Sequence, residues 1–370
     1  MKNVAVFHQL KRDWFYPARR DSGHCCDFAI SARFVAPVAA GRQAGRMSLE
    51  ASLDVAVVGG GFAGLSAALT LVRARRQVVV VDNGRPRNAP AAHSHGFLTR
   101  DGVPPLAMLE IGRGEIRGYG ADIVTGTATK LNRTPDGGFT VGLDDGTAIV
   151  SRRVLVSTGL VDELPEIPGL ADRWGRDVVH CPFCFGWELR DARLGVLSST
   201  SQAVAQALMW RQWSPHITVL QHSAAGPAAE DLREQLAARG IDVIEGRVVG
   251  VEVLDDRLRG VLLDDGRRVE LDAVVVGQWM QARHALLDDL GVGLVDHPAG
   301  IGSAARADPT GMVAPGVWVA GNTADVTLGV LQSAASGVSA AAAINADLTA
   351  EDTARAVARH RHATFRGGNQ

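Results

Sequence analysis

The sequence lacks several features that would indicate whole classes of protein. No apolar run reaches the roughly 20 residues needed to span a bilayer. The formal net charge is only -2, so the overall charge favours neither nucleic acid nor an anionic membrane as a partner. The chain has just four cysteines among its 370 residues, too few for a framework of structural disulfides. So few thiols are typical of a reducing compartment, and we expect a cytoplasmic protein.

What is present is the composition of an ordinary globular protein, 46% hydrophobic and 21% charged, with enough length for two domains. Residues 1–46 differ from the rest, because they are rich in arginine, poor in acids and without a sustained period. We interpret them as a disordered leader, with Met47 as the working start and Cys25-Cys26 as incidental. A targeting arm is the alternative, although an uninterrupted apolar stretch is missing.

A strand, a glycine turn and a helix open the ordered sequence. The strand is Leu53–Val58, the turn begins at Gly59, and the helix runs from about residue 65 to 74. Glycines allow a tight turn close to a pyrophosphate, which the helix N-terminus attracts. The next strand ends in Asp82, whose carboxylate can accept hydrogen bonds from a ribose diol. The pattern predicts a dinucleotide site containing Gly59, Gly61, Phe62, Ala63, Gly64, Asp82 and Asn83.

Three later stretches can reach the same ligand. Asn88 and His95 lie in polar loops after the second strand. One interpretation is that they contact the flavin of FAD, and the alternative is that they are ordinary polar loop residues. Two further buried strands stop in small-residue turns suited to passing under a nucleotide. These turns contribute Thr158, Gly159, Gly321 and Asn322. We expect a helix of small residues from about 329 to 345, and a separate amphipathic tail from about 350.

The pair Cys181 and Cys184, separated by proline and phenylalanine, is the centre of the predicted chemistry. Two thiols at this spacing can close into a disulfide and open again, and therefore store two electrons. Half of a zinc site is the alternative, but a second CxxC or a close histidine pair is missing. His180 either moves protons, lowers a thiol pKa or only packs. Four tryptophans nearby line a pocket or belong to the core, namely Trp174, Trp187, Trp210 and Trp213.

A second strand-turn-helix unit follows the cysteines, from Leu194 to about Trp213. Ser198 and Thr200 replace the first two glycines that a pyrophosphate needs, and the next strand ends in Gln221-His222 without an acid or an arginine cluster. This pattern predicts a nicotinamide-domain scaffold without its binding residues. We therefore predict an α/β fold with two Rossmann-like three-layer domains, the second (161–276) inserted into the first (47–160 and 277–350), and a tail at 351–370.

These motifs, from Asp54 to about Asp347, resemble the low-molecular-weight thioredoxin reductase-like family of FAD-dependent pyridine nucleotide-disulfide oxidoreductases. Within it, the chain is most similar to the dithiol oxidases of the gliotoxin and holomycin type, which share Gly186-Trp187-Glu188 and an eroded second glycine motif. Two positions depart from the pattern. Phe185 stands where the family has an acid or histidine, and Asn322 where reductases have aspartate.

The resemblance implies an enzyme with FAD as cofactor, acting as a homodimer on a small-molecule or peptide dithiol. Substrate thiolate would attack Cys181, Cys184 would pass the electrons to the flavin, and oxygen would take them as hydrogen peroxide. His180 is the remaining candidate for proton transfer, since Phe185 cannot move protons. An NADPH-dependent thioredoxin reductase-like enzyme is the alternative, and a non-catalytic flavoprotein that binds or senses is a third reading. We predict no metal, no nucleic acid and no membrane partner.

Overall fold

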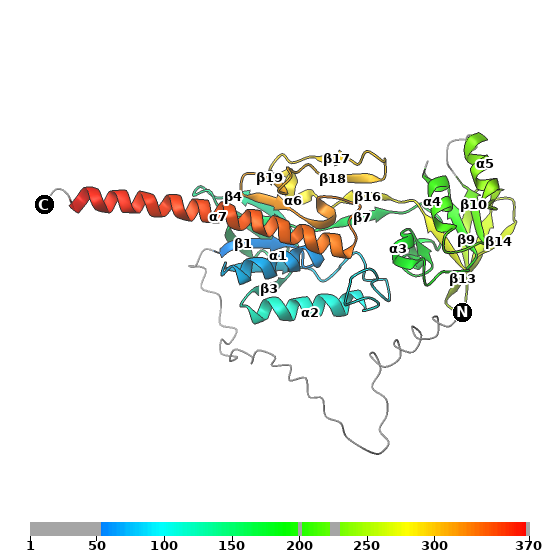
Figure 1. Ribbon diagram of the computed structural model, residues 1–370, viewed down its shortest axis with the longest axis horizontal. Helices are drawn as coiled ribbons and strands as arrows, with labels where there is room; N and C mark the ends of the chain where they lie inside the picture. Colours follow the sequence, from blue (N-terminus) through cyan, green and yellow to red (C-terminus); the bar gives the residue numbers. More distant parts are fainter. Residues whose placement is uncertain (1–52, 199–201, 223–229, 368–370) are drawn as a thin grey trace, which may run out of the picture. The chain divides into compact units, whose positions relative to one another are not determined.

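The structure is a computed structural model that describes residues 53–198, 202–222 and 230–367 (Figure 1). The predicted leader with Cys25 and Cys26, and positions 199–201 of the serine-rich turn, lie outside these residues. Within the described ranges, no helix is long and apolar enough to cross a membrane.

An eight-stranded sheet holds the first glycine motif. Its strands run in the order β19-β20-β6-β1-β2-β3, parallel from β20 to β3, and the antiparallel strands β5 and β4 continue from β6. The strands are β1 (Leu53–Val58), β2 (Val78–Asp82), β3 (Asp122–Thr125), β4 (Ala128–Arg133), β5 (Phe139–Leu143), β6 (Ala148–Val156), β19 (Met312–Ala314) and β20 (Val317–Val319).

Both faces of this sheet are buried, which explains the unbroken apolar runs in its central strands. Val55 and Val57 point to one face, where α1, α2 and α7 pack, and Ala56 and Val58 point to the other (Figure 1). The helices are α1 (Phe62–Arg73), α2 (Pro105–Gly118) and α7 (Val330–Gly367). The second face packs against the β4–β5 hairpin and α6 (Ala285–Asp288).

A smaller sheet and one short turn complete this part of the chain. Four strands pair in the order β17-β18-β16-β7, and a 3-10 turn follows β20. They are β7 (Leu160–Glu163), β16 (Trp279–Ala282), β17 (Leu294–Asp296), β18 (Gly302–Ala305) and η2 (Gly321–Thr323).

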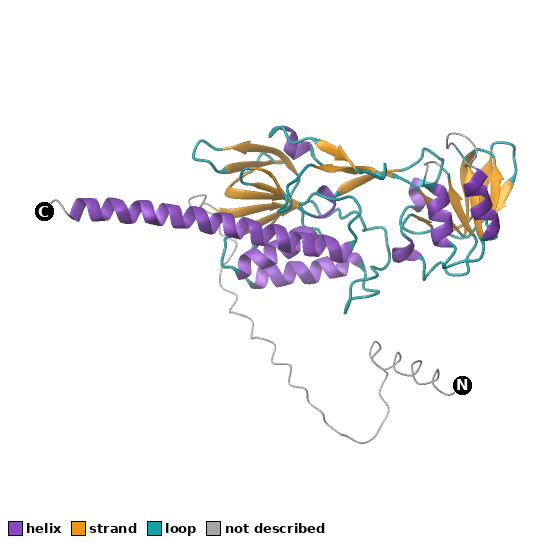
Figure 2. Ribbon diagram, turned by 45° about the horizontal axis from the view of Figure 1, so that its top comes forward, coloured by secondary structure: helices purple, strands orange, loops and turns teal. Residues whose placement is uncertain are grey.

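The second α/β unit is built on a five-stranded parallel sheet in the order β11-β10-β9-β15-β8. Helices cover one face, and a three-stranded antiparallel sheet packs on the other (Figure 2). Its elements are η1 (Ala171–Arg173), β8 (Val178–Val179), α3 (Pro182–Phe185), β9 (Leu194–Leu197), α4 (Ala203–Trp210), β10 (Ile217–Gln221), α5 (Glu230–Ala238), β11 (Asp242–Glu245), β12 (Val248–Leu254), β13 (Arg257–Leu263), β14 (Arg268–Glu270) and β15 (Ala273–Val276).

The mainly parallel eight-stranded sheet and the parallel five-stranded sheet, with their helices, confirm the predicted α/β class with two Rossmann-like units. The domain limits given above stay predictions. One element differs from the expectation, because the chain does not break between residues 345 and 350: α7 is a single helix of 38 residues.

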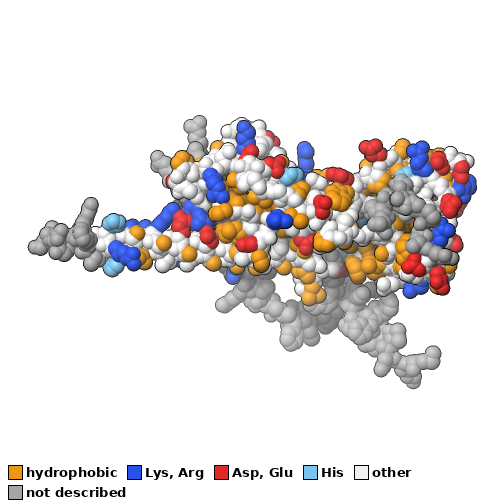
Figure 3. Space-filling view, turned by 90° about the horizontal axis from the view of Figure 1, so that it is seen from above, with side chains coloured by type: hydrophobic (Ala, Val, Ile, Leu, Met, Phe, Trp, Pro, Cys, Tyr) orange, Lys and Arg blue, Asp and Glu red, His pale blue; other side chains and the backbone are white. Residues whose placement is uncertain are grey.

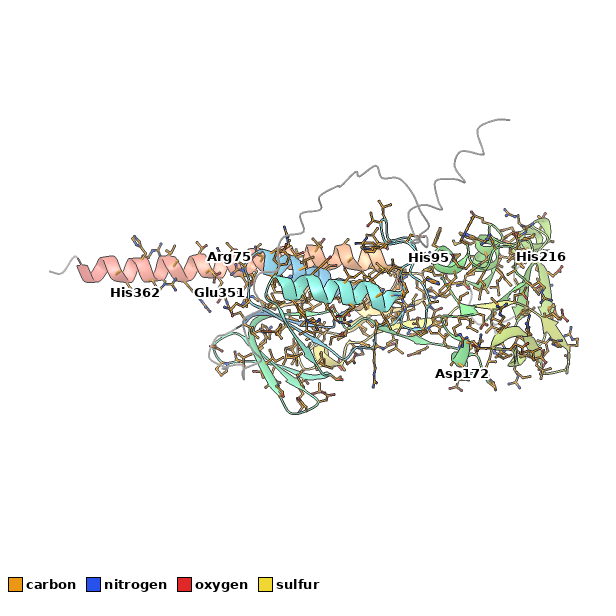
Figure 4. All side chains as sticks on the ribbon, turned by 90° about the horizontal axis from the view of Figure 1, so that it is seen from below. Arg75, His95, Asp172, His216, Glu351 and His362 are labelled. Carbon is orange, nitrogen blue, oxygen red and sulfur yellow. A yellow bond between two sulfur atoms is a disulfide. The ribbon has the colours of Figure 1, made fainter. Side chains whose placement is uncertain are left out.

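Ion pairs explain why α7 continues. Arg153 binds Asp347 at 2.5 Å and Glu351 at 2.6 Å, while Arg152 binds Asp352 at 2.6 Å and Asp54 at 2.8 Å. Glu351 is labelled in Figure 4. Glu351 and Asp352, which we assigned to a tail, therefore form ion pairs with arginines of β6, and one of these arginines also binds Asp54 of β1. Beyond them, arginine and histidine side chains gather at the C-terminal end of the helix (Figure 3).

Candidate functional site

The turn after β1 requires glycine at two positions. Gly59 has φ +107°, and a Cβ there would lie 2.3 Å from the carbonyl oxygen of Ser157. A Cβ on Gly64 would lie 1.9 Å from the carbonyl oxygen of Gly59. A side chain larger than hydrogen at either position would therefore push the turn away from β6 or from α1. At Gly61 nothing lies within 4 Å of the corresponding position, so a ligand can approach the backbone there.

The N-terminus of α1 offers free backbone amides at this opening. Gly61 is the N-cap residue and supplies no side-chain hydrogen bond, and the first turn, with Phe62 and Ala63, contains no acid. Unpaired N–H groups and the positive end of the helix dipole attract a negative group. This opening fits the pyrophosphate of a dinucleotide such as FAD.

Asp82 ends β2 beside the glycine turn. A Cβ on Gly60 would lie 2.7 Å from its carboxylate, and one carboxylate oxygen accepts a hydrogen bond from Arg113 at 2.9 Å. Asn83, the next residue, makes a contact within its own loop. Asn83 is exposed, and its Oδ1 accepts a hydrogen bond from the Arg85 amide at 3.2 Å.

The two other small-residue turns meet through a residue that sequence reasoning missed. Thr323 is fully buried, and its Oγ1 accepts a hydrogen bond from the Gly159 amide at 2.9 Å. Thr158 donates to the carbonyl of Arg283 at 2.8 Å. The Gly321 amide donates to Ser336 on α7 at 2.8 Å. The position of Thr323, directly after Gly321-Asn322, was the only signal available.

Asn322 uses its amide nitrogen to hold its own loop. Nδ2 donates to the carbonyl oxygens of Asp325 at 3.1 Å, Val326 at 3.3 Å and Leu328 at 2.9 Å. An aspartate at this position could not donate any of these bonds. The departure from the reductase pattern at Asn322 therefore has a structural reason.

Cys181 and Cys184 form a disulfide, with 5.3 Å between their Cα atoms. Cys181 is the N-cap residue of α3, and the Phe185 amide donates to its carbonyl oxygen at 3.2 Å. Phe185 itself packs with Leu189 against the core beneath α4. The residue that replaces the family's acid or histidine therefore anchors α3 to that core by apolar contact.

His180 stacks on Trp174, with ring centroids 5.4 Å apart and planes 20° apart. The pKa of His180 is lowered to about 4: burial is the largest cause, the positive charge of Arg87 adds to the lowering, and the negative charge of Asp162 opposes both. The imidazole is consequently neutral near neutral pH. A ring nitrogen can accept a hydrogen bond there, but the lowered pKa makes the imidazole a weak base and leaves no imidazolium to act as an acid.

The charges near His180 come from a paired set that the sequence did not reveal. Arg87 donates to Asp162 from Nε at 2.8 Å and from Nη2 at 2.6 Å, and the buried Gln278 donates to the same carboxylate at 3.2 Å. Arg87 and Gln278 both donate to Asp162, although they are 191 positions apart in the sequence. No local pattern can indicate such a contact.

Asn88 and His95, which we expected near a flavin, lie in the loops after β2. Asn88 is half-buried, and its carbonyl accepts a hydrogen bond from the Ala91 amide at 3.1 Å. His95, labelled in Figure 4, lies 3.4 Å from Asp101 and 3.5 Å from Glu188. Glu188 follows the cysteine pair, so His95 connects the two parts of the predicted site.

The second glycine-like turn is only partly described. At its edge, Gln202 donates to the carbonyl oxygen of Ala299. After β10, Nδ1 of His222 accepts a hydrogen bond from the Val248 amide at 3.0 Å, and burial lowers the pKa of His222. Over the described ranges, no three His, Cys, Asp or Glu side chains group as a metal site would require.

Comparisons with known proteins extend over most of the chain. A family model for pyridine nucleotide-disulphide oxidoreductase matches residues 53–342. A solved structure described as HlmI is 45% identical, with a TM-score of 0.80, over 85% of this chain and 98% of that chain. A probable thioredoxin reductase of Arthroderma benhamiae is 37% identical over 150 residues, which are 39% of this chain and 37% of that protein. Thioredoxin reductase tcpT of Claviceps purpurea is 29% identical over 264 residues, 66% of this chain and 79% of that protein.

Proposed function

The chain belongs to the pyridine nucleotide-disulphide oxidoreductase family, whose cofactor is FAD, and we propose that it oxidises a dithiol to a disulfide with oxygen as electron acceptor. The observation that carries the proposal is the Cys181–Cys184 disulfide at the N-terminus of α3. A closed disulfide is the form that accepts electrons from a dithiol. The similarity to HlmI supports the dithiol oxidase branch.

The cysteine chemistry balances in two exchanges. A substrate thiolate attacks Cys181, the Cys181–Cys184 bond breaks, and Cys184 leaves as thiolate. The second substrate thiolate then attacks the substrate sulfur of the mixed disulfide, which closes the substrate ring and releases Cys181. Two electrons and two protons have moved from the substrate to the enzyme. When bound, FAD would supply the acceptor for that electron pair, and its reaction with oxygen would give hydrogen peroxide.

We propose His180 as the base that takes a proton from the incoming thiol. Its lowered pKa of about 4 keeps it neutral, so a ring nitrogen can take the proton, and a base this weak then passes the proton on to water rather than keeping it. Stacking on Trp174 holds the ring in one orientation, and His180 directly precedes Cys181 in the chain. The pair Arg87 and Asp162 sets the charge around it.

The proposed FAD site consists of the residues predicted from the sequence, and the opening at Gly61 with its free amides supports it. We propose that the pyrophosphate lies at the N-terminus of α1 and the ribose near Asp82. The full set is Gly59, Gly61, Phe62, Ala63, Gly64, Asp82, Asn83, Asn88, His95, Thr158, Gly159, Gly321 and Asn322.

Steady-state assays with purified protein test the oxidase proposal. Dithiothreitol should drive oxygen consumption, with one hydrogen peroxide formed for each disulfide. Cys184→Ser and Cys181→Ser should each abolish it, because neither can re-form the disulfide. Oxygen uptake unchanged in Cys184→Ser would refute the proposed role of the pair. NADPH-driven disulfide reduction without oxygen uptake would instead support the reductase alternative.

We further propose a homodimer formed through an apolar surface on the eight-stranded unit. A pocket of about 240 Å³ opens between α1, α2, the loop at Phe97 and Ala334 on α7. Leu331 and Val338 continue the Ala334 stripe on α7, each 45% exposed, and Leu98 beside Phe97 is 82% exposed. Such contiguous apolar surface is typical of protein interfaces.

Light scattering on a sizing column tests the dimer. Leu98→Asp combined with Val338→Asp should convert a dimer to a monomer, and a monomeric wild type would refute the proposal. We also propose that the protein works in the cytoplasm, which the low cysteine count supports. Cell fractionation that finds it in an oxidising compartment would contradict this.

A further inference from the structure

Two short strands carry the chain between the eight-stranded unit and the second α/β unit, which holds the disulfide. β7 leads from β6 toward the cysteine pair, and β16 leads back from β15; both are labelled in Figure 1. The two strands pair antiparallel, with Asp162 opposite Met280. A contact that fixes this pair of strands therefore also helps to fix the unit that they carry.

Arg87, in the loop after β2, contacts both connecting strands. Its Nε and Nη2 donate to the Asp162 carboxylate at 2.8 and 2.6 Å, and Nη2 also lies 3.6 Å from the sulfur of Met280. The Asp162 side chain is only 6% exposed. If Arg87 moved away, a buried carboxylate would lose its counter-charge, which is costly. The folded chain therefore favours the arrangement in which Arg87 joins the two strands.

The same loop meets the second α/β unit at another point. A Cβ on Gly175 would lie 3.0 Å from the Cβ of Pro90, which is three residues after Arg87. Gly175 has φ +77° and follows Trp174, the ring on which His180 stacks. The absence of a side chain at Gly175 lets the loop come close to residues that precede the disulfide.

We infer that Arg87 is a positioning residue, which holds the second α/β unit in place through both connecting strands so that the cysteine pair can pass electrons to FAD. The inference rests on the proposed function, because it takes this electron transfer as the step that needs the placement. A misplacement of about 1 Å can slow a reaction about a hundredfold. A guanidinium stays protonated, so Arg87 can orient other groups but cannot take a proton from a thiol.

Rapid kinetics on the FAD-loaded protein test the inference by separating two steps. Anaerobic dithiothreitol first opens the disulfide, which acid quenching and alkylation of the free thiols measure, and the flavin absorbance then falls. In Arg87→Ala, disulfide opening should keep its rate, and loss of the flavin absorbance should slow by about tenfold to a hundredfold. Slower disulfide opening in this variant would overturn the inference, because Arg87 would then act on the attack of the thiol.

Arg193→Ala is the matched control. Arg193 donates to Asp272 from Nε at 3.1 Å and from Nη2 at 2.8 Å, and both residues belong to the second α/β unit. This variant loses a similar two-pronged pair without freeing the connecting strands, so both steps should keep their rates. Loss of flavin absorbance slowed as much as in Arg87→Ala would reduce the effect to a general loss of stability and overturn the inference.

Arg87→Lys separates the position of Arg87 from its charge. Lysine keeps the positive charge that acts on His180 but loses the two-pronged pair with Asp162. Loss of the flavin absorbance should therefore stay slower in Arg87→Lys than in the wild type. Wild-type rates in this variant would show that the charge alone suffices and would overturn the inference.

Hydrogen exchange of backbone amides tests the holding role without any turnover. In the FAD-loaded protein, β7 and β16 should exchange about tenfold faster in Arg87→Ala than in the wild type or in Arg193→Ala, because they have lost their buried partner. Unchanged exchange in these strands would refute the inference whatever the redox activity. If dithiothreitol does not remove the flavin absorbance of the wild type, the proposed function fails, and the exchange rates alone decide whether Arg87 holds the strands.

Discussion

Gly337→Ala is the substitution that tests the packing behind the FAD site most sharply. Gly337 is buried in α7, where the helix crosses the first turn of α1. A Cβ there would lie 2.0 Å from the carbonyl oxygen and 2.8 Å from the carbonyl carbon of Ala63. A backbone carbonyl in a helix cannot rotate away, so α7 and α1 must separate. The expected result is a less stable protein that holds FAD more weakly.

A second helical glycine, Gly114, serves as the control from which the packing cost of Gly337→Ala is obtained. Gly114 lies in the exposed face of α2 with nothing within 4 Å of its Cβ position. Replacing a helical glycine by alanine gains about 1 kcal/mol from helix propensity, and this gain is common to both sites. The difference between the two variants is therefore the packing cost at Gly337, about 1–3 kcal/mol.

Urea denaturation of the FAD-loaded protein measures both values, and release of fluorescent FAD on warming reports the cofactor. Gly114→Ala should be at least as stable as the wild type. Gly337→Ala should unfold at lower urea than Gly114→Ala and release FAD at lower temperature. Equal stability of the two variants would refute the close approach of α7 to α1.

Three further predictions follow from particular contacts. Asn322→Asp should lower the free energy of unfolding by about 1–3 kcal/mol, because three carbonyl oxygens lose their donor; thermal unfolding measures it, and a neutral effect would contradict the role of Nδ2. Because the pKa of His180 is about 4 when folded and 6.5 when unfolded, stability should be complete above pH 6.5 and fall toward pH 4, by at most about 3 kcal/mol. The same pH series with His180→Gln should show a smaller fall, and an identical one would exclude this histidine. Arg153→Ala should accelerate hydrogen exchange in α7 beyond Asp347, whereas Arg355→Ala, which removes a guanidinium 55% exposed, should have little effect.

Local sequence patterns predicted the elements whose bounds are determined by a short stretch of residues, such as an apolar run or a glycine turn. The strand Leu53–Val58 has the predicted bounds, since its β-branched run ends at a glycine turn. The helix after the turn begins at Phe62, three residues before the expected start, because only Gly61 has to lie outside it. The disulfide between Cys181 and Cys184 follows from their spacing. The roles of these residues in catalysis and FAD binding stay predictions.

Long-range contacts set the features that sequence reasoning missed. The charges around His180 come from Arg87 and Asp162, which no spacing connects to it. The continuation of α7 depends on arginines in β6, nearly 200 positions earlier in the chain. The bonds from Nδ2 of Asn322 to its own loop could not be predicted either, and the role of Asn322 in FAD binding stays a prediction. In each case the deciding partner is distant in sequence or is a backbone carbonyl.

Anaerobic mixing of the FAD-loaded protein with dithiothreitol and, separately, with NADPH tests the central claim most directly. The account predicts that dithiothreitol removes the flavin absorbance through Cys181 and Cys184, that NADPH does not, and that air restores the colour with formation of hydrogen peroxide. Rapid loss of the flavin absorbance with NADPH, and none with the dithiol, would contradict it.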